Sequence, residues 1–318
     1  MTIRLGVVMD PLGNLNVHKD STFAMLLEAQ HRNWNIFHLQ SSDLYLSDTA
    51  VMGKATSISL QSDPAHRIKP GDQTIEDLNE LDVILMRKDP PFDMEYIYTT
   101  YLLEHVHQSG TPVINHPASL RNANEKLLAT RFPECTVPFV VSRNRGALGD
   151  FVDEYKKTVI KPLDSMAGDS VFCVRHDDPN RNVILETVTR HGAQTVMAQK
   201  LIADYQKGDK RILLIDGEPV PHALLRIPAQ GELRANLAKG GTAQSVALTQ
   251  RDRWICEQVG AELKTMQIDF AGIDVIGDYL TEINITSPTG IRELDRMCNL
   301  NIAATLLDSI EKRHLHHP

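Results

Sequence analysis

The sequence predicts an open α/β sheet in its first third, followed by two α+β units. In the first third, short apolar runs alternate with helical segments, which is typical of a sheet covered by helices. Around residues 121–125 the pattern changes to a smaller α+β unit, and from residue 209 the chain contains two antiparallel hairpins. The chain has 318 residues, enough for about two domains of ordinary size with a large buried core.

The first third supplies the elements of the open sheet. Residues 3–9 form a continuous apolar run, which predicts a buried parallel strand. Ser21 predicts the cap of a helix that continues to Gln30. Residues 47–73 show no strong period, so hairpin strands and a long loop both fit that segment. The other expected elements are strands at 35–39, 82–86 and 112–114 and a helix at 94–108.

The remaining two thirds of the sequence predict the two α+β units. The first unit is expected to contain helices at 125–132, 149–156 and 183–191 and strands at 139–141, 158–161, 171–174 and 196–199. The second is expected to contain a hairpin (211–215 and 219–226), a helix at 248–266 broken near Gly260, a second hairpin (268–276 and 279–285) and a closing helix at 302–313. Asp216-Gly217 favours a tight turn in the first hairpin. The polar loop at 227–242 has a length that is usually functional.

Composition and charge exclude several classes of protein. The formal net charge of −8 is opposite to that of proteins that grip nucleic acid phosphates. No apolar run reaches the length of a transmembrane helix, so we expect no membrane partner. The four cysteines are scattered and form no C-x-x-C pair, which argues against a zinc site or a disulfide framework and fits a reducing cytoplasm.

Two carboxylates and an amide stand on the last predicted hairpin. Glu282 and Asn284 are two residues apart on a strand, so their side chains leave the same face. A three-residue loop at 277–279 would place Asp274 opposite Glu282. Oxygen ligands of this kind suit Mg²⁺, which binds few carboxylates together with substrate phosphates. The alternative is three polar residues on the solvent face of an antiparallel strand.

Two lysines stand where a phosphate group would need them. Lys126 begins a helix, and Lys161 ends an apolar strand just before a loop of small residues at 164–170. The backbone N–H groups of such a loop are suited to phosphate oxygens, although the loop lacks the P-loop motif. Taken singly, a lysine at either position is more often a solvated surface charge.

Other candidates concern a nucleotide base, a ribose and carboxylate substrates. A strand edge at Gln199 and Leu201 would present backbone groups to an adenine ring, and Asp209 would accept from ribose hydroxyls. Taken alone, this pattern is more often a plain strand end. Arginines match carboxylates in bidentate fashion, and the candidates are Arg87 with its neighbour Asp89, Arg226, Arg234 and Arg292. The sequence contains no recognisable Ser-His-Asp or Cys-His arrangement.

Several of these segments together resemble bacterial glutathione synthetases. The segments are DSTFAMLLEAQ (20–30), MRKDPPFD (86–93), NEKL (124–127), DGEPVP (216–221) and TEINITSPT (281–289). An acidic-x-Asn strand is shared by many ATP-grasp ligases, whereas the MRKDPPFD run is much narrower. The likeness extends from about residue 5 to about residue 310.

The resemblance implies an ATP-grasp fold and a set of site residues. The expected domains are an N-terminal substrate and assembly domain (1–122), a lid subdomain (123–200) and a catalytic subdomain (201–318). The implied ATP-binding residues are Lys126, Lys161, Gly168, Gln199, Leu201, Asp209 and Arg211, and the implied catalytic residues are Arg211, Arg226 and Arg234. The implied metal ligands for Mg²⁺, or Mn²⁺ in its place, are Asp274, Glu282 and Asn284, and the implied substrate-binding residues are Arg87, Asp89, Arg226 and Arg292.

The resemblance also implies the reaction. ATP as co-substrate would phosphorylate the cysteinyl carboxylate of γ-glutamylcysteine, and the amine of glycine would displace phosphate to give glutathione. No covalent enzyme intermediate is needed, which agrees with the absence of a nucleophile motif. A homotetramer is implied as well. The alternatives are an ATP-grasp ligase that joins another acid and amine, which would lack the MRKDPPFD run, or a non-catalytic nucleotide-binding protein, which would lack one of the three metal ligands.

Overall fold

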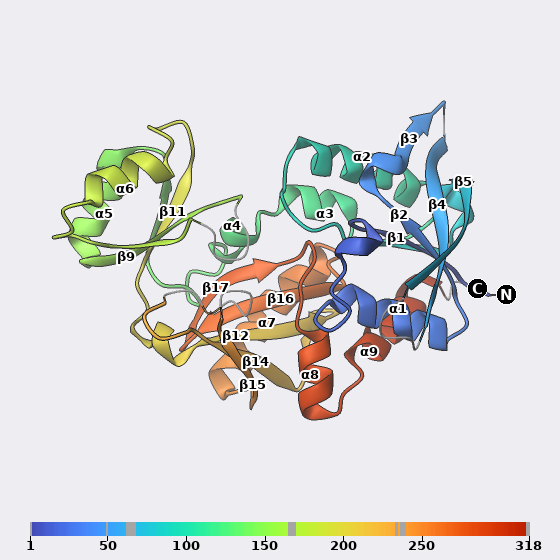
Figure 1. Ribbon diagram of the computed structural model, residues 1–318. Helices are drawn as coiled ribbons and strands as arrows, with labels where there is room; N and C mark the ends of the chain where they lie inside the picture. Colours follow the sequence, from blue (N-terminus) through green and yellow to red (C-terminus); the bar gives the residue numbers. More distant parts are fainter. Residues whose placement is uncertain are drawn as a thin grey trace.

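The computed structural model describes residues 2–48, 50–61, 68–164, 170–232, 235 and 240–315. Within these residues the strands form a seven-stranded N-terminal sheet, a four-stranded sheet that we call the small sheet, and a six-stranded sheet that we call the central sheet. Figure 1 shows the N-terminal sheet at one end of the molecule, the small sheet at the other, and the central sheet between them. No helix among the described residues is long and apolar enough to cross a membrane.

The N-terminal sheet has the order β3-β4-β2-β1-β6-β7, with β5 paired to β4. Its strands are β1 (Arg4–Val8), β2 (Asn35–Leu39), β3 (Leu44–Ser47), β4 (Ala50–Leu60), β5 (Ile68–Asp77), β6 (Val83–Met86) and β7 (Val113–Ile114). β1, β2, β6 and β7 run parallel, and β3, β4 and β5 add to them in antiparallel fashion. The predicted open α/β sheet is therefore confirmed, and the ambiguous segment contributes hairpin strands.

Helices cover both faces of the N-terminal sheet because side chains alternate along its strands. Leu5 and Val7 of β1 pack with the apolar residues of α1 (Ser21–His31) and α9 (Ile302–Ile310), whereas Val8 packs with α2 (Met94–Gln108). The expectation that Ser21 caps α1 is wrong. Asp20 is the N-cap, because its side chain accepts a hydrogen bond from the Thr22 N–H at 2.7 Å.

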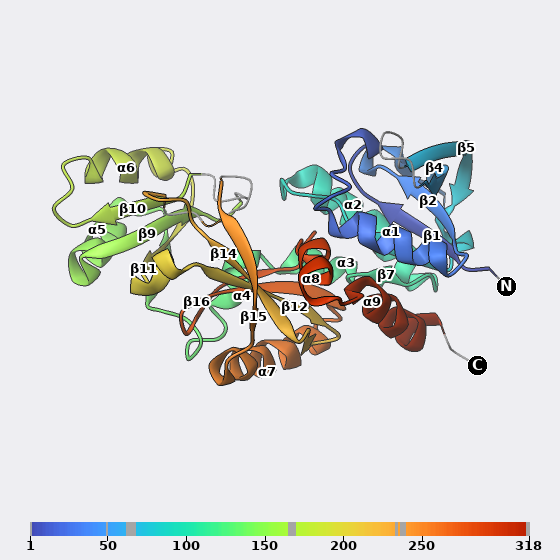
Figure 2. The same cartoon turned by 60° about the horizontal axis from the view of Figure 1, so that its bottom comes forward.

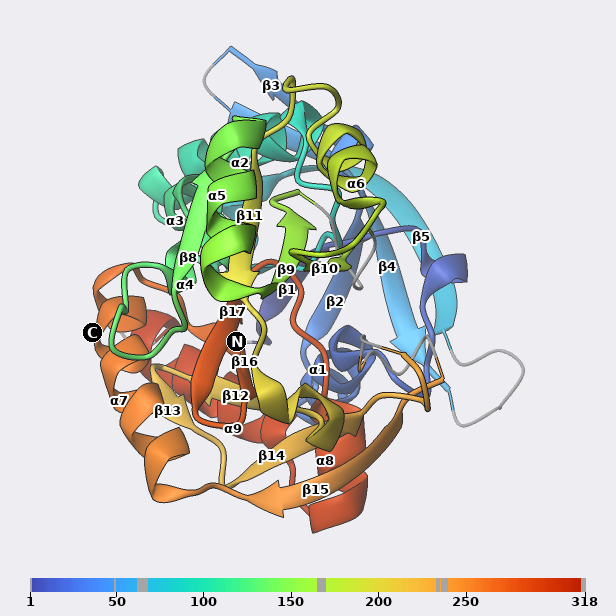
Figure 3. The ribbon, with the colours of Figure 1, turned by 90° about the vertical axis from the view of Figure 1, so that its left-hand side faces the viewer.

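The small sheet is antiparallel and carries its own core. Its order is β10-β9-β11-β8, with β8 (Phe139–Ser142), β9 (Lys157–Pro162), β10 (Phe172–Arg175) and β11 (Val196–Lys200). Leucines and valines of α5 (Arg145–Tyr155) and α6 (Arg181–Val188) pack against it in a separate apolar cluster. Viewed from this end, α5 and β11 lie in front and β1, β2 and β4 lie behind (Figure 3). Helix α5 begins before the predicted residue 149 because the Asn144 side chain caps it.

The central sheet has the order β15-β14-β12-β16-β17, with β13 paired to β12. Its strands are β12 (Asp209–Ile215), β13 (Glu218–Pro219), β14 (His222–Ile227), β15 (Thr242–Ala247), β16 (Phe270–Ile276) and β17 (Tyr279–Asn284). Helix α7 (Gln250–Thr265) packs along one face of this sheet (Figure 2). Strand β15 and helix α8 (Ile291–Cys298) are not among the predicted elements.

Two glycines explain how α7 approaches the first hairpin. Asp216 and Gly217 have φ values of 48° and 72°, which confirms the predicted tight turn. A Cβ on Gly260 would lie 2.1 Å from the Gly217 carbonyl oxygen. The predicted break of the helix near Gly260 is wrong, since α7 continues through this residue. The glycine instead allows the helix to contact the turn.

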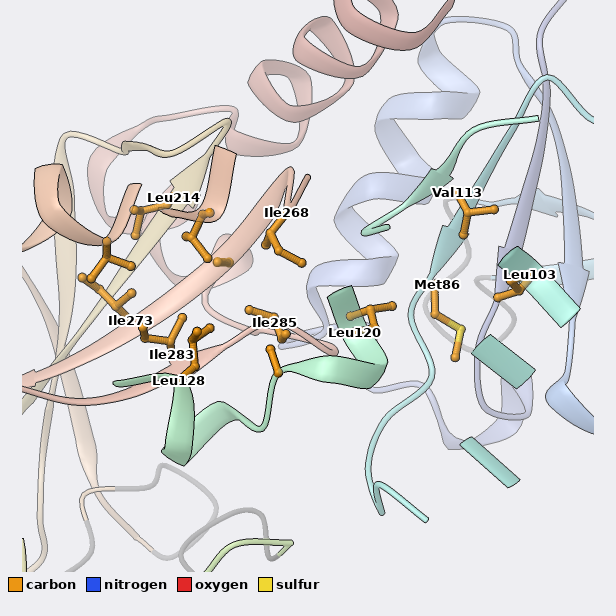
Figure 4. Close-up of a cluster of buried hydrophobic side chains, with 14 of the residues drawn as sticks. Met86, Leu103, Val113, Leu120, Leu128, Leu214, Ile268, Ile273, Ile283 and Ile285 are labelled. Atoms are coloured by element: carbon orange, nitrogen blue, oxygen red, sulfur yellow. The ribbon is translucent and has the colours of Figure 1, made fainter. Parts of the chain in front are cut away.

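A continuous apolar core joins the N-terminal and central sheets. Figure 4 shows this core extending from Met86 and Val113 through Leu120 and Ile285 to Ile273. Two short helices lie along this junction, α3 (Pro117–Asn122) and α4 (Glu125–Ala129). The core therefore fixes α4 beside β17, where the predicted site residues lie.

Candidate active site

A cleft of about 510 Å³ lies where the three parts of the protein meet. Its walls come from the loop between β1 and α1, the segment after β6, the start of α4, the end of β9, strands β12, β14, β16 and β17, and the start of α8. Nine predicted site residues line it: Asp89, Lys126, Lys161, Asp209, Arg211, Arg226, Asp274, Glu282 and Asn284. The cleft therefore gathers predicted site residues that are up to 195 positions apart in the sequence, from Asp89 to Asn284.

Strand pairing places the charged residues of the central sheet side by side. Arg211 on β12 is opposite Asp274 on β16, and Asp274 is opposite Glu282 on β17. On the other side, Asp209 is opposite Arg226 on β14. Because residues two apart on a strand share a face, these side chains all point to the cleft side of the sheet. The opposite face is apolar and packs against α7.

The register between β16 and β17 differs in detail from the prediction. Asp274 does stand opposite Glu282, as predicted, but the connecting turn is two residues long. Ile276 pairs with Tyr279, and an irregularity between Asp274 and Val275 shifts the register by one residue. The predicted three-residue loop is therefore wrong, and a bulge restores the same pairing.

Asp274 lies at the centre of an ion-pair network. Arg211 donates to it through Nε at 2.5 Å and Nη2 at 2.9 Å, and Arg226 contacts Oδ2 through Nη2 at 3.0 Å. Arg226 also donates from Nε to Asp209 Oδ1 at 2.5 Å. Burial disfavours the charge of Asp274, but the two arginines outweigh it and lower its pKa. Two buried guanidinium groups are thus held in fixed positions toward the cleft.

Glycine at position 272 makes room for this network. A Cβ on Gly272 would lie 2.8 Å from Arg211 Cδ and 3.2 Å from Pro288 Cβ. Arg211 therefore lies directly over the backbone of β16, and its Nη1 extends toward the Thr289 carbonyl oxygen at 3.4 Å.

Lys126 and Lys161 meet near Glu282. Lys126 Nζ lies 3.3 Å from Glu282 Oε1, and Lys161 Nζ donates to the Thr281 carbonyl oxygen at 3.0 Å. Burial lowers the pKa of Lys161 to about 8, an effect that the charge of Glu282 opposes. The two predicted phosphate-binding lysines, from different elements, thus share one corner of the cleft.

Glu125 fixes the position of α4 against the segment after β17. Its half-buried side chain accepts hydrogen bonds at Oε1 from Ile285 N at 2.8 Å, Thr286 N at 3.0 Å and Thr286 Oγ1 at 2.9 Å. Burial and the nearby charge of Glu282 raise its pKa. Asn124 caps the helix by accepting from the N–H groups of Lys126 and Leu127 at 3.1 Å each. Lys126 is thereby held beside Glu282.

The predicted metal ligands lie together on the cleft face. Asn284 Nδ2 donates to Asp274 Oδ2 at 3.3 Å, so its Oδ1 is the atom with acceptor capacity for a cation. Among the described residues, no group of three or more His, Cys, Asp or Glu side chains has the geometry to hold a metal ion. A metal here would depend on Glu282, Asn284 and substrate phosphates, with Asp274 partly engaged by arginines. This donor set, few carboxylates with an amide, fits Mg²⁺.

Some predicted substrate residues lie behind the cleft wall. Arg87 is buried, donates to Thr22 Oγ1 at 3.1 Å and to the Pro288 carbonyl oxygen at 3.0 Å, and does not line the cleft. Arg292 lies with its guanidinium 5.4 Å from the centre of the Phe23 ring. Both arginines therefore contact protein groups, whereas Asp89 lines the cleft and is hydrogen-bonded to Ser287.

The predicted strand edge at Gln199 is wrong. β11 is an inner strand, paired with β8 on one side and β9 on the other. The N–H of Lys200 donates to the Pro138 carbonyl oxygen, and that of Leu201 donates to the Lys157 carbonyl oxygen, at 3.0 Å each. Gln199 is buried and Leu201 is half-buried at the end of the strand. Two further predicted residues, Gly168 and Arg234, lie outside the described residues.

Several cleft residues have no counterpart among the predicted ones. They are Asn14, Asn16, Lys19, Asp20, Glu125, Ser287 and Glu293. Glu293 lies in the first turn of α8. Had that helix been recognised in the sequence, Glu293 would have been found as an acidic residue near its start. Glu125 stands in the NEKL segment beside Lys126, where a buried acceptor cannot be told from a surface glutamate.

Comparisons with known proteins agree with this arrangement. Residues 3–121 match the family described as prokaryotic glutathione synthetase, N-terminal domain, and residues 125–299 match prokaryotic glutathione synthetase, ATP-grasp domain. The chain is 50% identical over 310 residues to a glutathione synthetase of Pseudomonas aeruginosa, covering 98% of each chain. It is 48% identical over 314 residues to that of Coxiella burnetii, covering 99% of this chain and 98% of the relative.

Solved structures share the fold at low sequence identity. A D-cycloserine synthetase aligns over 97% of this chain and 99% of its own with a TM-score of 0.68 and 14% identity. A D-alanyl-alanine synthetase A of Vibrio cholerae aligns over 99% of both chains with a TM-score of 0.58 and 13% identity. The predicted ATP-grasp fold is confirmed, and the chain belongs to the prokaryotic glutathione synthetase family of ATP-grasp ligases.

Proposed function

We propose that this protein joins γ-glutamylcysteine and glycine to form glutathione, with conversion of ATP to ADP and phosphate. Full-length identity of about half to glutathione synthetases supports the reaction. The observation that carries it is the cleft, where Lys126, Lys161, Arg211 and Arg226 face the same space as Glu282 and Asn284. A triphosphate and a carboxylate repel each other, and this cluster of cations offsets that repulsion.

Lys126 and Lys161 are the proposed ligands of the ATP phosphates. Both are buried, both line the cleft, and they approach it from α4 and β9. Gly168 is proposed to donate its backbone N–H to a phosphate oxygen. The adenine is proposed to bind at the end of β11 beside Gln199 and Leu201 on the strength of the family resemblance. The ribose is proposed to bind at Asp209, which would exchange part of its pairing with Arg226 for a hydroxyl group.

A carboxylate does not react with an amine at neutral pH, because its leaving group would be oxide. Transfer of the γ-phosphoryl group to the cysteinyl carboxylate gives an acyl phosphate, and the glycine amine then displaces phosphate. Arg211 and Arg226 are proposed to stabilise the negative charge that develops on the transferring group and on the acyl oxygen. Arg234, which stands in the sequence between β14 and β15, is proposed to assist them.

Asp274, Glu282 and Asn284 are proposed to hold Mg²⁺, with Mn²⁺ as a substitute. The bound cation supplies charge screening for the phosphates. Asp89 and Arg226 are proposed to contact the dipeptide directly, since both line the cleft. Arg87 and Arg292 would act on the dipeptide through the segment at 286–290 and through α8, because their contacts are with protein groups.

The division of the chain and its assembly are also proposals. An N-terminal domain (1–122), a lid subdomain (123–200) and a catalytic subdomain (201–318) agree with the separate apolar cluster of the small sheet. A homotetramer is proposed from the resemblance alone. A cytoplasmic location is proposed because the four cysteines are unpaired.

Release of ADP from the purified protein tests the function. With ATP, Mg²⁺ and γ-glutamylcysteine, ADP should form rapidly only when glycine is added, and mass spectrometry should detect glutathione in equal amount. ADP formation that requires a different acid or amine would favour another ATP-grasp ligase. Binding of ATP without turnover of any acid and amine pair would favour a non-catalytic nucleotide-binding protein.

A further inference from the structure

Glu293 places a buried carboxylate oxygen at the cleft without a protein partner. The residue lies in the first turn of α8, is only 6% exposed and lines the cleft. Its Oε2 is inaccessible to solvent and has no hydrogen-bond partner among the described residues. A buried carboxylate is costly unless it is paired, so an unpaired oxygen at a cleft wall points to a ligand that pairs with it.

The other carboxylates that line the cleft already have partners. Glu125 accepts hydrogen bonds from Ile285 and Thr286, and Asp20 accepts one from Thr22. Asp274 pairs with Arg211 and Arg226, and Asp209 pairs with Arg226. Glu282 pairs with Lys126, and Asp89 is hydrogen-bonded to Ser287. The Glu293 oxygen is the only cleft-lining atom among the buried described side-chain atoms that lack a hydrogen bond.

The cations assigned to the phosphates are not among the charges that act most on Glu293. The charges that act on it most are those of Arg296, Lys19 and Arg292, and burial raises its pKa in spite of them. None of the three donates to Oε2, and the Arg292 guanidinium lies over the Phe23 ring. Lys19 lines the cleft and is exposed, so its ammonium group is accessible to a ligand.

We propose that Glu293 and Lys19 form the subsite for the α-amino acid end of the glutamyl residue, with Glu293 accepting from its ammonium group and Lys19 contacting its carboxylate. The inference rests on the proposed function, since γ-linkage leaves both α groups of this residue free. A zwitterion needs one anion and one cation at the same place, which this pair supplies. The glycine amine, in contrast, must reach the acyl phosphate near the phosphate-binding lysines.

A purely structural role for Glu293 predicts different behaviour. A glutamate in the first turn of a helix is stabilised by the helix dipole without any ligand. Its replacement by glutamine would then weaken α8 and affect every substrate of the cleft alike. A ligand role predicts instead that the effect depends on whether the substrate carries an ammonium group.

The test compares γ-glutamylcysteine with glutaryl-cysteine, which lacks only the α-ammonium group. The wild-type protein should use glutaryl-cysteine with a kcat/KM lower by about ten- to a hundredfold, as for loss of a charged hydrogen bond. Glu293→Gln should lose a similar factor on γ-glutamylcysteine and discriminate less than about threefold between the two dipeptides, with the KM for glycine unchanged. Lys19→Met should raise the KM for both dipeptides alike, because both keep the α-carboxylate.

Asp295→Asn is the matched control, since it removes a carboxylate from the same helix and keeps the acceptor for the Ile302 N–H. It should retain wild-type discrimination. Equal losses on both dipeptides in Glu293→Gln would overturn the inference. The inference would also be overturned if the wild-type protein used both dipeptides equally well. This comparison does not depend on whether any variant folds. A wild-type protein without turnover of γ-glutamylcysteine would overturn the proposed function as well, so the two failures are distinguishable.

Discussion

Lys161 is a buried residue, only 9% exposed, and its Nζ donates a hydrogen bond to the Thr281 carbonyl oxygen. We expect Lys161→Met to weaken ATP binding by about ten- to a hundredfold, because methionine keeps the apolar stem but removes a charged hydrogen-bond donor. Lys200→Met is the control, since Lys200 is exposed and lies over the Tyr155 ring with 5.9 Å between Nζ and the ring centroid. Isothermal titration with ATP and Mg²⁺ measures both. Equal losses in the two variants would show that Lys161 is not a phosphate ligand.

Glu282 pairs with Lys126 at 3.3 Å and lies directly opposite Asp274. We expect Glu282→Gln to reduce kcat on the order of a thousandfold while ATP affinity changes much less, because the lost charge is needed most when the phosphoryl group transfers. ADP release at saturating Mg²⁺ gives kcat, and equilibrium titration gives the affinity. Turnover close to that of the wild-type protein under these conditions would exclude Glu282 as a metal ligand.

At the scale of the elements, Glu125 joins α4 to the segment after β17. Glu125→Ala would leave two buried N–H groups and one hydroxyl without their acceptor. We expect the free energy of unfolding to fall by about 3 kcal/mol. Chemical denaturation measures the change. The control is Glu134→Ala, at an exposed position in the turns between α4 and β8, which should change stability little. A loss in Glu125→Ala no larger than in the control would show that the three contacts contribute nothing.

The elements that the sequence predicts best are those whose pattern is local. The turn at Asp216-Gly217 and the helix at 94–108 have the predicted positions, because a positive φ at the turn and the Asp93 cap before the helix are properties of the segments themselves. Strand β15 is different. Half of its sequence, TAQSVA, is polar, and it becomes a strand because β14 offers an edge for pairing. Pairing of this kind is a property of the partner and leaves no local signal.

In the candidate site, too, the features that depend on local sequence were predicted and those that depend on distant partners were not. The alternation of side chains along β17 predicts that Glu282 and Asn284 share a face, and the structure agrees. The pairing of Arg211 with Asp274 joins residues 63 positions apart and depends on the register of two strands. The burial of Arg87 against Thr22 and Pro288 depends on how the N-terminal and central parts pack together. Neither contact is visible in the spacing of the sequence.

At the scale of the whole molecule, the N-terminal and central parts are joined at a cluster of histidines. His107 at the end of α2 and His116 before α3 contact each other edge to face, with ring centroids 4.5 Å apart. Buried Asp269, just before β16, accepts from Arg313 at 2.6 Å and contacts His314 at 2.9 Å. Glu104 and Arg121 are the other charged groups that act on these two histidines. Arg313 and His314, which follow α9, therefore contact this junction.

Acid should destabilise the protein through this junction. Burial lowers the pKa of His107 and of His116, with further lowering of His107 by His116 and His314. Since histidine in an unfolded chain has a pKa near about 6.5, the unfolded state takes up protons that the folded state does not, and stability falls as the pH drops below that value. The Tm of the wild-type protein should fall between pH 7.5 and 5.5, and we expect this fall to be smaller in His107→Gln, by about 1 °C or more. Glutamine can still accept a hydrogen bond from the Val113 N–H, but it does not titrate. Differential scanning fluorimetry measures the difference, and His105→Gln, at an exposed position of the same helix, should leave the wild-type loss unchanged. An identical loss in all three proteins would place the acid sensitivity of the protein elsewhere than this junction.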